Sequence, residues 1–246
     1  MKVSVVMASY QKAYALDHVL FSICKQGPQP GEVEVIVVDD GSEDRTATIL
    51  NGWAMGPLKG VLRWVRLDRP GVRGASLARN VGYRMAQGEI IIAQSPDVVH
   101  DRLDTITRLS QIEPGTFVIA KVWNHAGPWP TTDLPTDPFH LYTAPSNPRP
   151  FFFLGSLWRK DLYAIGGDDE DFTDPGYEDD FFADRLIHGL GLKPVFSETI
   201  VGYHLDHKRE GRQRDEEMKA IYLAKHLLAS TGRAPWVASG GAWPWK

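Results

Sequence analysis

The strongest constraint on the fold of this chain is the alternation of two patterns along its first 112 residues. Short runs rich in β-branched residues are typical of strands. Each run is followed by a stretch in which apolar residues recur every three or four positions, which predicts a helix. The predicted strands are Val3–Met7, Glu34–Val38, Leu62–Leu67 and Glu89–Ala93, and the predicted helices are Ala15–Cys24, a segment through Ile49, Ser76–Met85 and Asp101–Ile112.

Four consecutive strand–helix units predict an α/β fold, with a mostly parallel central sheet and helices on both faces. The apolar run Val35–Val38 supports this arrangement, because a central parallel strand is covered on both sides. In such sheets ligands bind beyond the carboxyl ends of the strands. We therefore look for functional residues at 8–10, 39–40, 68–69 and 94–97.

The second half of the chain is less regular. We expect strands at Phe117–Trp123, Phe151–Trp158 and Lys193–Tyr203, and helices at Phe181–Ile187 and Arg214–Ser230. Seven prolines between residues 126 and 150 exclude a regular helix or a central strand there. In the last predicted helix of the first half, Leu103, Ile106 and Leu109 are expected to face inward.

Composition limits the class of protein. The chain has 246 residues, 43% of them hydrophobic, and a net charge of -4, which suits one sizeable core. The absence of clustered Lys and Arg argues against a nucleic-acid surface. No apolar run approaches the ~18 residues of a membrane span, and residues 1–11 do not fit a signal peptide. We therefore expect a cytoplasmic protein. Its single cysteine, Cys24, cannot form an intrachain disulfide.

Three groups of polar residues follow the predicted strands of the first half. Asp39 and Asp40 can accept hydrogen bonds from a nucleotide's base or ribose, although the same residues are common in turns and helix caps. Arg79 can face a phosphate or simply lie on the surface of a packing helix. Asp97 suits a hard cation such as Mg²⁺ or Mn²⁺, or serves as a turn residue.

Two further groups lie in the second half. Glu178, Asp179 and Asp180 lead into an apolar helix face. Crowded carboxylates raise one another's pKa, which suits a general base. A solvated acidic loop and a structural calcium site are the alternatives. His204 and His207 follow the last predicted strand, where histidine can bind a metal beside a carboxylate or lie on the surface.

Taken in order, these segments resemble the inverting glycosyltransferases of family 2, which have the GT-A fold. The resemblance covers roughly residues 1–207, and the acidic segment also resembles the Glu-Asp-Asp segment of galactosyl- and N-acetylgalactosaminyltransferases. It is carried by Val-Ser-Val-Val-Met-Ala-Ser-Tyr (3–10), Val-Ile-Val-Val-Asp-Asp-Gly-Ser (35–42), Ala-Arg-Asn-Val-Gly (78–82), Gly-Glu-Ile-Ile-Ile (88–92), Gly-Gly-Asp-Asp-Glu (166–170), Tyr-Glu-Asp-Asp (177–180) and Val-Gly-Tyr-His (201–204).

The resemblance implies one catalytic domain over 1–207, with a nucleotide-sugar half at 1–112 and an acceptor half at 113–207, followed by a C-terminal helix and tail at 208–246. Ala8, Tyr10 and Asp40 would line the nucleoside pocket, with Asp40 on the base. Arg79, or Arg73 just before it, would lie near the diphosphate. Uridine diphosphate is the expected carrier of the sugar.

The resemblance also implies a divalent metal, Mn²⁺ or Mg²⁺. Asp97 matches the second acid of the family's Asp-X-Asp motif, and His204 matches the late metal ligand, with His207 as a weaker candidate. The sequence departs from the motif because Ser95 replaces the first acid. We therefore expect metal binding that is weaker or depends more on histidine.

The matching position for the catalytic base is Asp179, with Glu178 and Asp180 beside it to hold a carbohydrate or other hydroxyl acceptor. The base would take the acceptor proton while the hydroxyl attacks the anomeric carbon from the face opposite the leaving group, so inversion is expected. Acceptor contacts are expected from residues 124–150 and from the tail.

Two alternatives stay open. A sugar nucleotidyltransferase would need a Gly-rich basic loop after the first strand, where residues 8–11 read Ala-Ser-Tyr-Gln. A non-catalytic nucleotide- or sugar-binding module is favoured by Ser95 and opposed by the intact acidic segment and His204.

Overall fold

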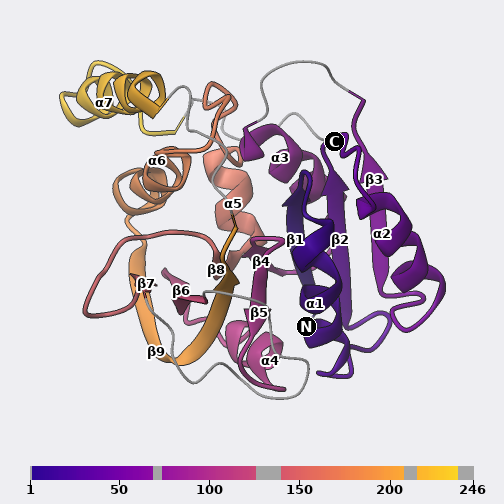
Figure 1. Cartoon of the computed structure of the whole chain (residues 1–246). Coiled ribbons are helices and arrows are strands. Elements are labelled where there is room, and N and C mark those ends of the chain that lie inside the picture. The colour runs from indigo at the N-terminus through magenta and orange to yellow at the C-terminus, as the bar shows by residue number, and fades with distance from the viewer. Residues whose placement is uncertain (1, 69–73, 126–139, 208–214, 238–246) are drawn as a thin grey trace.

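The computed structural model describes residues 2–68, 74–125, 140–207 and 215–237 (Figure 1). Within them the chain alternates between strands and helices for its first half and then becomes irregular. The elements are β1 (Val3–Ser9), α1 (Ala13–Cys24), β2 (Val33–Asp39), α2 (Thr46–Met55), β3 (Leu62–Arg66), α3 (Ala75–Met85), β4 (Ile90–Gln94), β5 (Val98–His100), α4 (Thr105–Leu109), β6 (Thr116–His125), β7 (His140–Thr143), β8 (Leu154–Trp158), α5 (Arg159–Ile165), α6 (Glu178–Asp184), a π-helical turn (Arg185–Gly189), β9 (Lys193–Leu205) and α7 (Asp215–Ser230).

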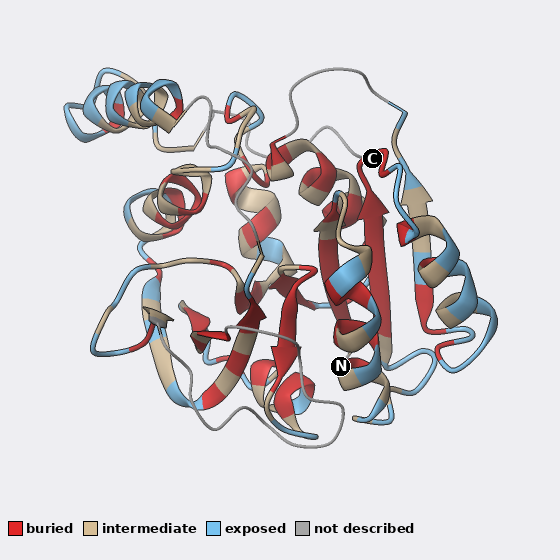
Figure 2. Ribbon diagram, viewed as in Figure 1, coloured by how far each residue is buried: buried red, intermediate tan, exposed pale blue. Residues whose placement is uncertain are grey.

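All described strands join one sheet, in the order β3-β2-β1-β4-β8-β6-β9-β5, with β7 paired to β6. The first four strands are parallel, as predicted. Their side chains alternate between two cores: Val5 packs on the side of α1 and α2, and Val6 packs on the side of α3 and α5. This double burial explains why the strands read as continuous apolar runs, and Figure 2 shows β1 and β2 as buried almost throughout.

The second half adds antiparallel strands to the sheet. β8 is antiparallel to both β4 and β6, and β5 is antiparallel to β9, whereas β6 and β9 run parallel. This pairing brings three distant positions into one row, because His204 of β9 is in register with both Val98 of β5 and Asn124 of β6. The mixed α/β architecture with helices on both faces confirms the predicted fold class.

Some predicted elements differ from those observed. The helix expected from Asp101 to Ile112 is only α4, because residues 98–100 pair as a strand and residues 101–104 form the turn that follows. Leu103 lies in that turn and is 68% exposed, so its predicted inward position is wrong. The strand expected from Phe151 begins at Leu154. β5, β7 and α5 were not predicted, since each is too short to show a period.

The helix α7 lies beside α6, with Tyr222 stacked on Tyr177 at a centroid distance of 5.6 Å. Met218 is its most buried apolar residue, and much of its surface is exposed (Figure 2). Over the residues that the structure describes, no helix combines the length and the apolar character needed to cross a bilayer.

Gly82 sets how closely α3 packs on the sheet. A Cβ at this position would lie 2.5 Å from Val6 Cγ1 and 3.3 Å from Val38 Cγ2. We expect Gly82→Ala to destabilise the protein by ~1–3 kcal/mol through overpacking, measured by urea unfolding. Gly52→Ala in α2 is the matched control, because nothing lies within 4 Å of its Cβ; it should stabilise the helix by ~0.5–1 kcal/mol. Equal effects at both glycines would contradict the close packing of α3.

Candidate functional site

The carboxyl ends of β1 and β2 lie side by side. Ser9 is in register with Asp39, and the backbone N–H of Asp40 donates to the Ser9 carbonyl at 2.8 Å. Asp40 is buried, Ala8 is half-buried and Tyr10 is exposed. The three residues predicted to line a nucleoside pocket therefore share one edge of the sheet.

The turn after β1 is fixed by the loop after β2. Gln11 has a left-handed backbone, with φ of 54°, which is uncommon for a residue other than glycine. Its N–H donates to Ser42 Oγ at 2.9 Å, and its side-chain oxygen accepts from the Asp44 N–H at 3.1 Å. The Ala13 N–H donates to the Asp44 carboxylate at 3.0 Å. These bonds hold the residue between them, Lys12, in a defined place.

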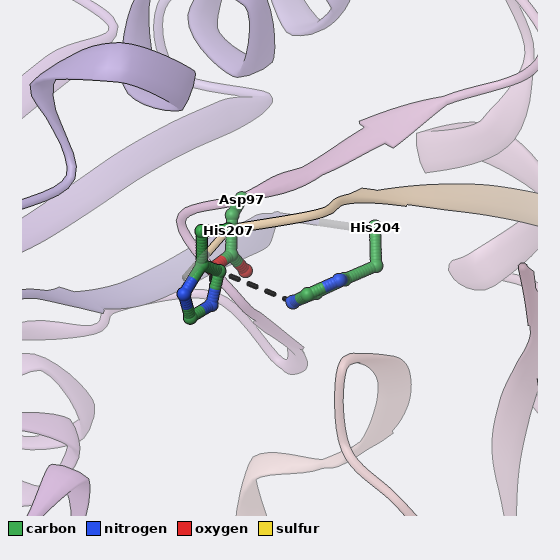
Figure 3. A group of neighbouring side chains, drawn as sticks. All are labelled: Asp97, His204 and His207. Atoms are coloured by element: carbon green, nitrogen blue, oxygen red, sulfur yellow. Dashed lines mark ion pairs between the residues drawn. The ribbon is translucent and has the colours of Figure 1, made fainter. Parts of the chain in front are cut away.

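Asp97 is the centre of a polar cluster between β4 and β5. Its side chain is 2% exposed. The Ser95 hydroxyl donates to its Oδ1 at 2.6 Å, so the residue that replaces the first acid of Asp-X-Asp orients the second. The other oxygen, Oδ2, lies 3.5 Å from the Nε2 atoms of both His204 and His207 (Figure 3). One carboxylate oxygen and two imidazole nitrogens thus lie within 4.8 Å of one another.

The orientation of His204 is set by two residues behind it. The Asn124 amide donates to the Asp206 carboxylate at 3.2 Å, which turns the amide oxygen toward the histidine. That oxygen lies 2.7 Å from His204 Nδ1, so Nδ1 carries a hydrogen and donates it. In neutral His204 the lone pair then sits on Nε2 and faces Asp97. A cation at this position, either a proton on Nε2 or a metal ion between the two groups, removes the repulsion between that lone pair and the carboxylate oxygen.

Lys12 enters the same cluster from the turn after β1. Its ammonium donates to Asp97 Oδ2 at 2.6 Å and to the Tyr14 hydroxyl at 3.2 Å, and lies 3.0 Å from His207 Nε2. Burial raises the pKa of Asp97, but the charges and hydrogen bonds of protonated His204 and of Lys12 outweigh it and hold the pKa of that carboxyl well below its ordinary value. Asp97 is therefore a carboxylate at neutral pH.

A second cluster surrounds the acidic segment at the start of α6. Arg79 of α3 donates to Asp179 Oδ1 at 2.7 Å and lies 4.0 Å from Asp168. Asn80, the next residue, donates to the Asp168 carbonyl at 2.9 Å and accepts from the Asp168 N–H at 2.8 Å. Arg79 and Asn80 thus bind the acidic stretches that contain Asp168 and Asp179 to α3.

Left-handed backbone shapes both acidic stretches. Gly166 and Gly167 have φ of 78° and 74°, a region that glycine enters at no steric cost, and they turn the chain from α5 into Asp168. Tyr177 has φ of 65° just before Glu178, and its stacking on α7 holds it there. The Glu178 carboxylate accepts from the Gly176 N–H at 2.6 Å.

Aromatic residues connect the two clusters. Phe153 lies 5.4 Å from the His204 ring, and Phe151 lies 5.5 Å from Phe153, both between ring centroids. The Arg149 guanidinium lies 4.3 Å from the centre of the Phe151 ring, and its Nη2 is 3.5 Å from Asp180. The path from the Asp97 cluster to the acidic cluster is therefore a half-buried apolar strip with charged groups at both ends.

Two acids of the second cluster hold protons near neutral pH. Burial raises the pKa of Asp168 to about 7; Arg79 lowers it and Asp179 raises it to a smaller extent. Burial and the charge of Asp179 likewise raise the pKa of Glu178 to about 7. Burial raises the pKa of Asp180 as well. Acids whose protons exchange near pH 7 are common in sites of proton transfer.

The raised pKa of Asp168 predicts a pH effect on stability. Its ordinary pKa is ~3.9, so between about pH 4 and pH 7 the unfolded chain has released a proton that the folded chain keeps. Its contribution to stability therefore falls as the pH rises through this window. We expect Asp168→Asn to gain melting temperature relative to the wild type between pH 5 and pH 8. Asp68→Asn, at a carboxyl that is 95% exposed, is the control and should show no such gain. Parallel pH curves for Asp168→Asn and the wild type would contradict the buried proton.

The structure gathers the residues predicted from the sequence into two groups. The first contains Ser95, Asp97, His204 and His207, next to the edge with Ala8, Tyr10 and Asp40. The second contains Arg79 with Glu178, Asp179 and Asp180. Arg73 lies outside the described residues. Arg79 contacts the acidic segment, a partner that the sequence did not indicate.

Sequence reasoning missed three residues of these groups. Lys12 stands just after a predicted strand, and that position was its only signal. Asn124 carries no motif, and only the register of β6 with β9 places it behind His204. Asp168 belongs to the Gly-Gly-Asp segment, but its neighbours in sequence do not show that Arg79 and Asn80 contact it.

Comparison with known proteins identifies one family. Residues 4–166 match the sequence profile of glycosyl transferase family 2. The match covers the parallel half of the sheet and Asp97, and it ends before Glu178 and His204.

Individual relatives agree with this match. Glycosyltransferase GlyG of Streptococcus pneumoniae is 31% identical over 125 residues, which are 50% of this chain and 40% of GlyG. The mannosyltransferase PcManGT from Pyrobaculum calidifontis, solved with GDP-Man and Mn²⁺, has a TM-score of 0.67 at 21% identity over 97% of this chain and 66% of its own. S. aureus TarS 1–349, solved with UDP-GlcNAc, has a TM-score of 0.63 at 20% identity over 94% and 66%. This chain spans 30% to 52% of the length of the curated relatives that it matches.

Proposed function

This chain belongs to glycosyl transferase family 2, and from that premise we propose that it transfers a sugar from a nucleoside-diphosphate sugar to an acceptor hydroxyl with inversion. The observation that carries the proposal is the strip of Phe151 and Phe153, which joins a candidate cation site to a cluster of acids. A donor bound at one end would present its anomeric carbon toward the acids at the other.

The donor half comprises residues 1–112 in this proposal. Asp40 binds the nucleoside base at the carboxyl edge of β2, and Tyr10 and Ala8 flank it. PcManGT binds GDP-Man and TarS binds UDP-GlcNAc; we propose a uridine carrier for this chain. The acceptor half comprises residues 113–207.

The residues at Asp97 fit a divalent cation. The donor set is one carboxylate and two imidazoles, a combination that suits Mn²⁺ better than Mg²⁺, which prefers oxygen ligands. His204 presents Nε2 to the site because Asn124 holds Nδ1. When bound, the cation offsets the negative charge that develops on the leaving nucleoside diphosphate. Asp97, His204 and, less centrally, His207 would hold it.

Asp179 is the general base in this proposal. Arg79 fixes one of its oxygens at 2.7 Å and leaves the other for the acceptor hydroxyl. Glu178 and Asp180 lie on either side and would bind the acceptor. The pKa values of Glu178 and Asp168, both about 7, allow the cluster to take up and pass on the acceptor proton near neutral pH.

The proposal is tested with a panel of uridine-, guanosine- and thymidine-diphosphate sugars in Mn²⁺. We expect one nucleoside diphosphate class to raise the melting temperature and its sugar to be released at a measurable rate when hydroxyl acceptors are added. Binding without release would favour the non-catalytic module. No binding to any member of the panel would overturn the proposed donor site.

Asn124 provides a test of the metal site alone. Asn124→Ala removes the acceptor that fixes the His204 ring, and loss of a hydrogen bond that orients a metal ligand typically costs ~10–100-fold in metal affinity. We expect that loss in Mn²⁺ binding measured by electron paramagnetic resonance. Asn51→Ala on the exposed face of α2 is the control. Unchanged Mn²⁺ affinity in Asn124→Ala would contradict a metal site that depends on the His204 orientation set by Asn124.

A further inference from the structure

The proposed function gives no role to Lys12, the charged residue that contacts Asp97 from the turn after β1. Its side chain is 20% exposed and its ammonium is surrounded by polar atoms. An ammonium has three hydrogens to donate. Three acceptors are in reach: Asp97 Oδ2 at 2.6 Å, His207 Nε2 at 3.0 Å and the Tyr14 hydroxyl at 3.2 Å. The group is therefore fully satisfied where it lies.

The position of Lys12 is set by the backbone around it. Gln11 and Ala13, its two neighbours, are both hydrogen-bonded to the loop at residues 42–44. The Lys12 carbonyl accepts from the N–H groups of Ala15 and Leu16 at the start of α1. The backbone of Lys12 is therefore fixed just after the carboxyl end of β1. Its long, flexible side chain reaches from there to Asp97.

The ammonium and a divalent cation need the same atoms. Asp97 Oδ2 is the oxygen that faces both histidines, and it is also the oxygen that Lys12 contacts. His207 Nε2 accepts from Lys12 with the lone pair that a metal would use. Ser95 adds no charge, so Asp97 and Lys12 together are neutral. A divalent ion beside a retained ammonium would be repelled by it.

We propose that the Lys12 ammonium occupies the cation position at Asp97 and exchanges there with the divalent metal. With the metal absent, the ammonium holds Asp97 and the histidines in place. With the metal bound, Lys12 leaves Oδ2 and its charge is free to reach the donor's diphosphate; this last step rests on the proposed function. Lys12 therefore lowers the affinity of the site for the metal.

The direct test is Mn²⁺ binding to the wild type, Lys12→Met and Lys25→Met, measured by electron paramagnetic resonance without any nucleotide. Lys25 is exposed at the end of α1 and is the matched control. We expect Lys12→Met to bind Mn²⁺ at least ~10-fold more tightly than the other two, which corresponds to ~1.4 kcal/mol. Equal or weaker binding by Lys12→Met, or no Mn²⁺ binding by any of the three, would overturn the exchange.

A second measurement uses only the wild type and guards against a variant that does not fold. Acetylation of lysines by acetic anhydride is followed by mass spectrometry with and without Mn²⁺. Addition of Mn²⁺ should speed modification of Lys12 several-fold and leave Lys25 unchanged. Slower or unchanged modification of Lys12 would overturn the proposal. Both readouts are independent of sugar transfer, so the exchange can hold even where the proposed function fails.

Discussion

Asp179→Asn is expected to lower the turnover of sugar transfer by ~10²–10⁴-fold, the usual contribution of a positioned general base. The amide keeps an oxygen for the hydrogen bond from Arg79, now 2.7 Å from the carboxylate, so the local structure should persist. The substitution removes the proton acceptor together with the negative charge that pairs with Arg79. Donor binding, measured by the melting temperature with nucleoside diphosphate and Mn²⁺, should stay at the wild-type value.

Two variants make this result specific. Asp171 lies in the preceding loop, where its carboxyl is 70% exposed and pairs with Lys225. The variant Asp171→Asn should therefore retain turnover. Arg79→Met should lower turnover as well, because Asp179 loses the group that fixes its orientation. Full activity in Asp179→Asn would assign the base to another acid, and Glu178 and Asp168 would be tested next.

The parts of the fold that follow from local pattern were predictable. β1 and β2 are apolar on both faces and lie between helices with clear periodicity, so their type and order could be read from the sequence. β5 has three residues and no period of its own, and it exists only because β9 pairs with it. Leu103 was assigned to a helix face because apolar spacing alone cannot show that residues 101–104 form a turn.

The candidate site divides in the same way. Asp97 and Asp40 could be found because the ends of parallel strands meet at one edge of a sheet. The contact of Arg79 with Asp179 joins residues 100 positions apart, and that of His204 with Asn124 joins residues 80 positions apart. Any acid could have paired with Arg79, and the choice is made by how α3 packs against the loops before α6. Sequence pattern carries no record of such pairings.

Asp97→Asn is expected to abolish the metal-dependent part of donor binding. For the wild type, nucleoside diphosphate at ~100 times its dissociation constant with Mn²⁺ should add ~2.7 kcal/mol of stability. In a chain of this size that is a rise of roughly 5–11 °C in melting temperature, at ~2–4 °C per kcal/mol. The variant should show none of the rise that Mn²⁺ contributes, because it loses the only carboxylate among the three grouped side chains.

The same variant separates the role of Asp97 in binding metal from its role in holding Lys12. Asp97→Asn leaves the ammonium, 2.6 Å away, without its charged partner, so the unliganded protein should also melt at a lower temperature. Lys12→Met removes the other member of the pair and should instead raise Mn²⁺ affinity. The two substitutions break the same ion pair by removing opposite partners. If Asp97 only held Lys12 in place and bound no metal, neither substitution would lower the Mn²⁺ affinity. Opposite changes in Mn²⁺ affinity, loss in Asp97→Asn and gain in Lys12→Met, are the result that requires metal and ammonium to compete for one oxygen.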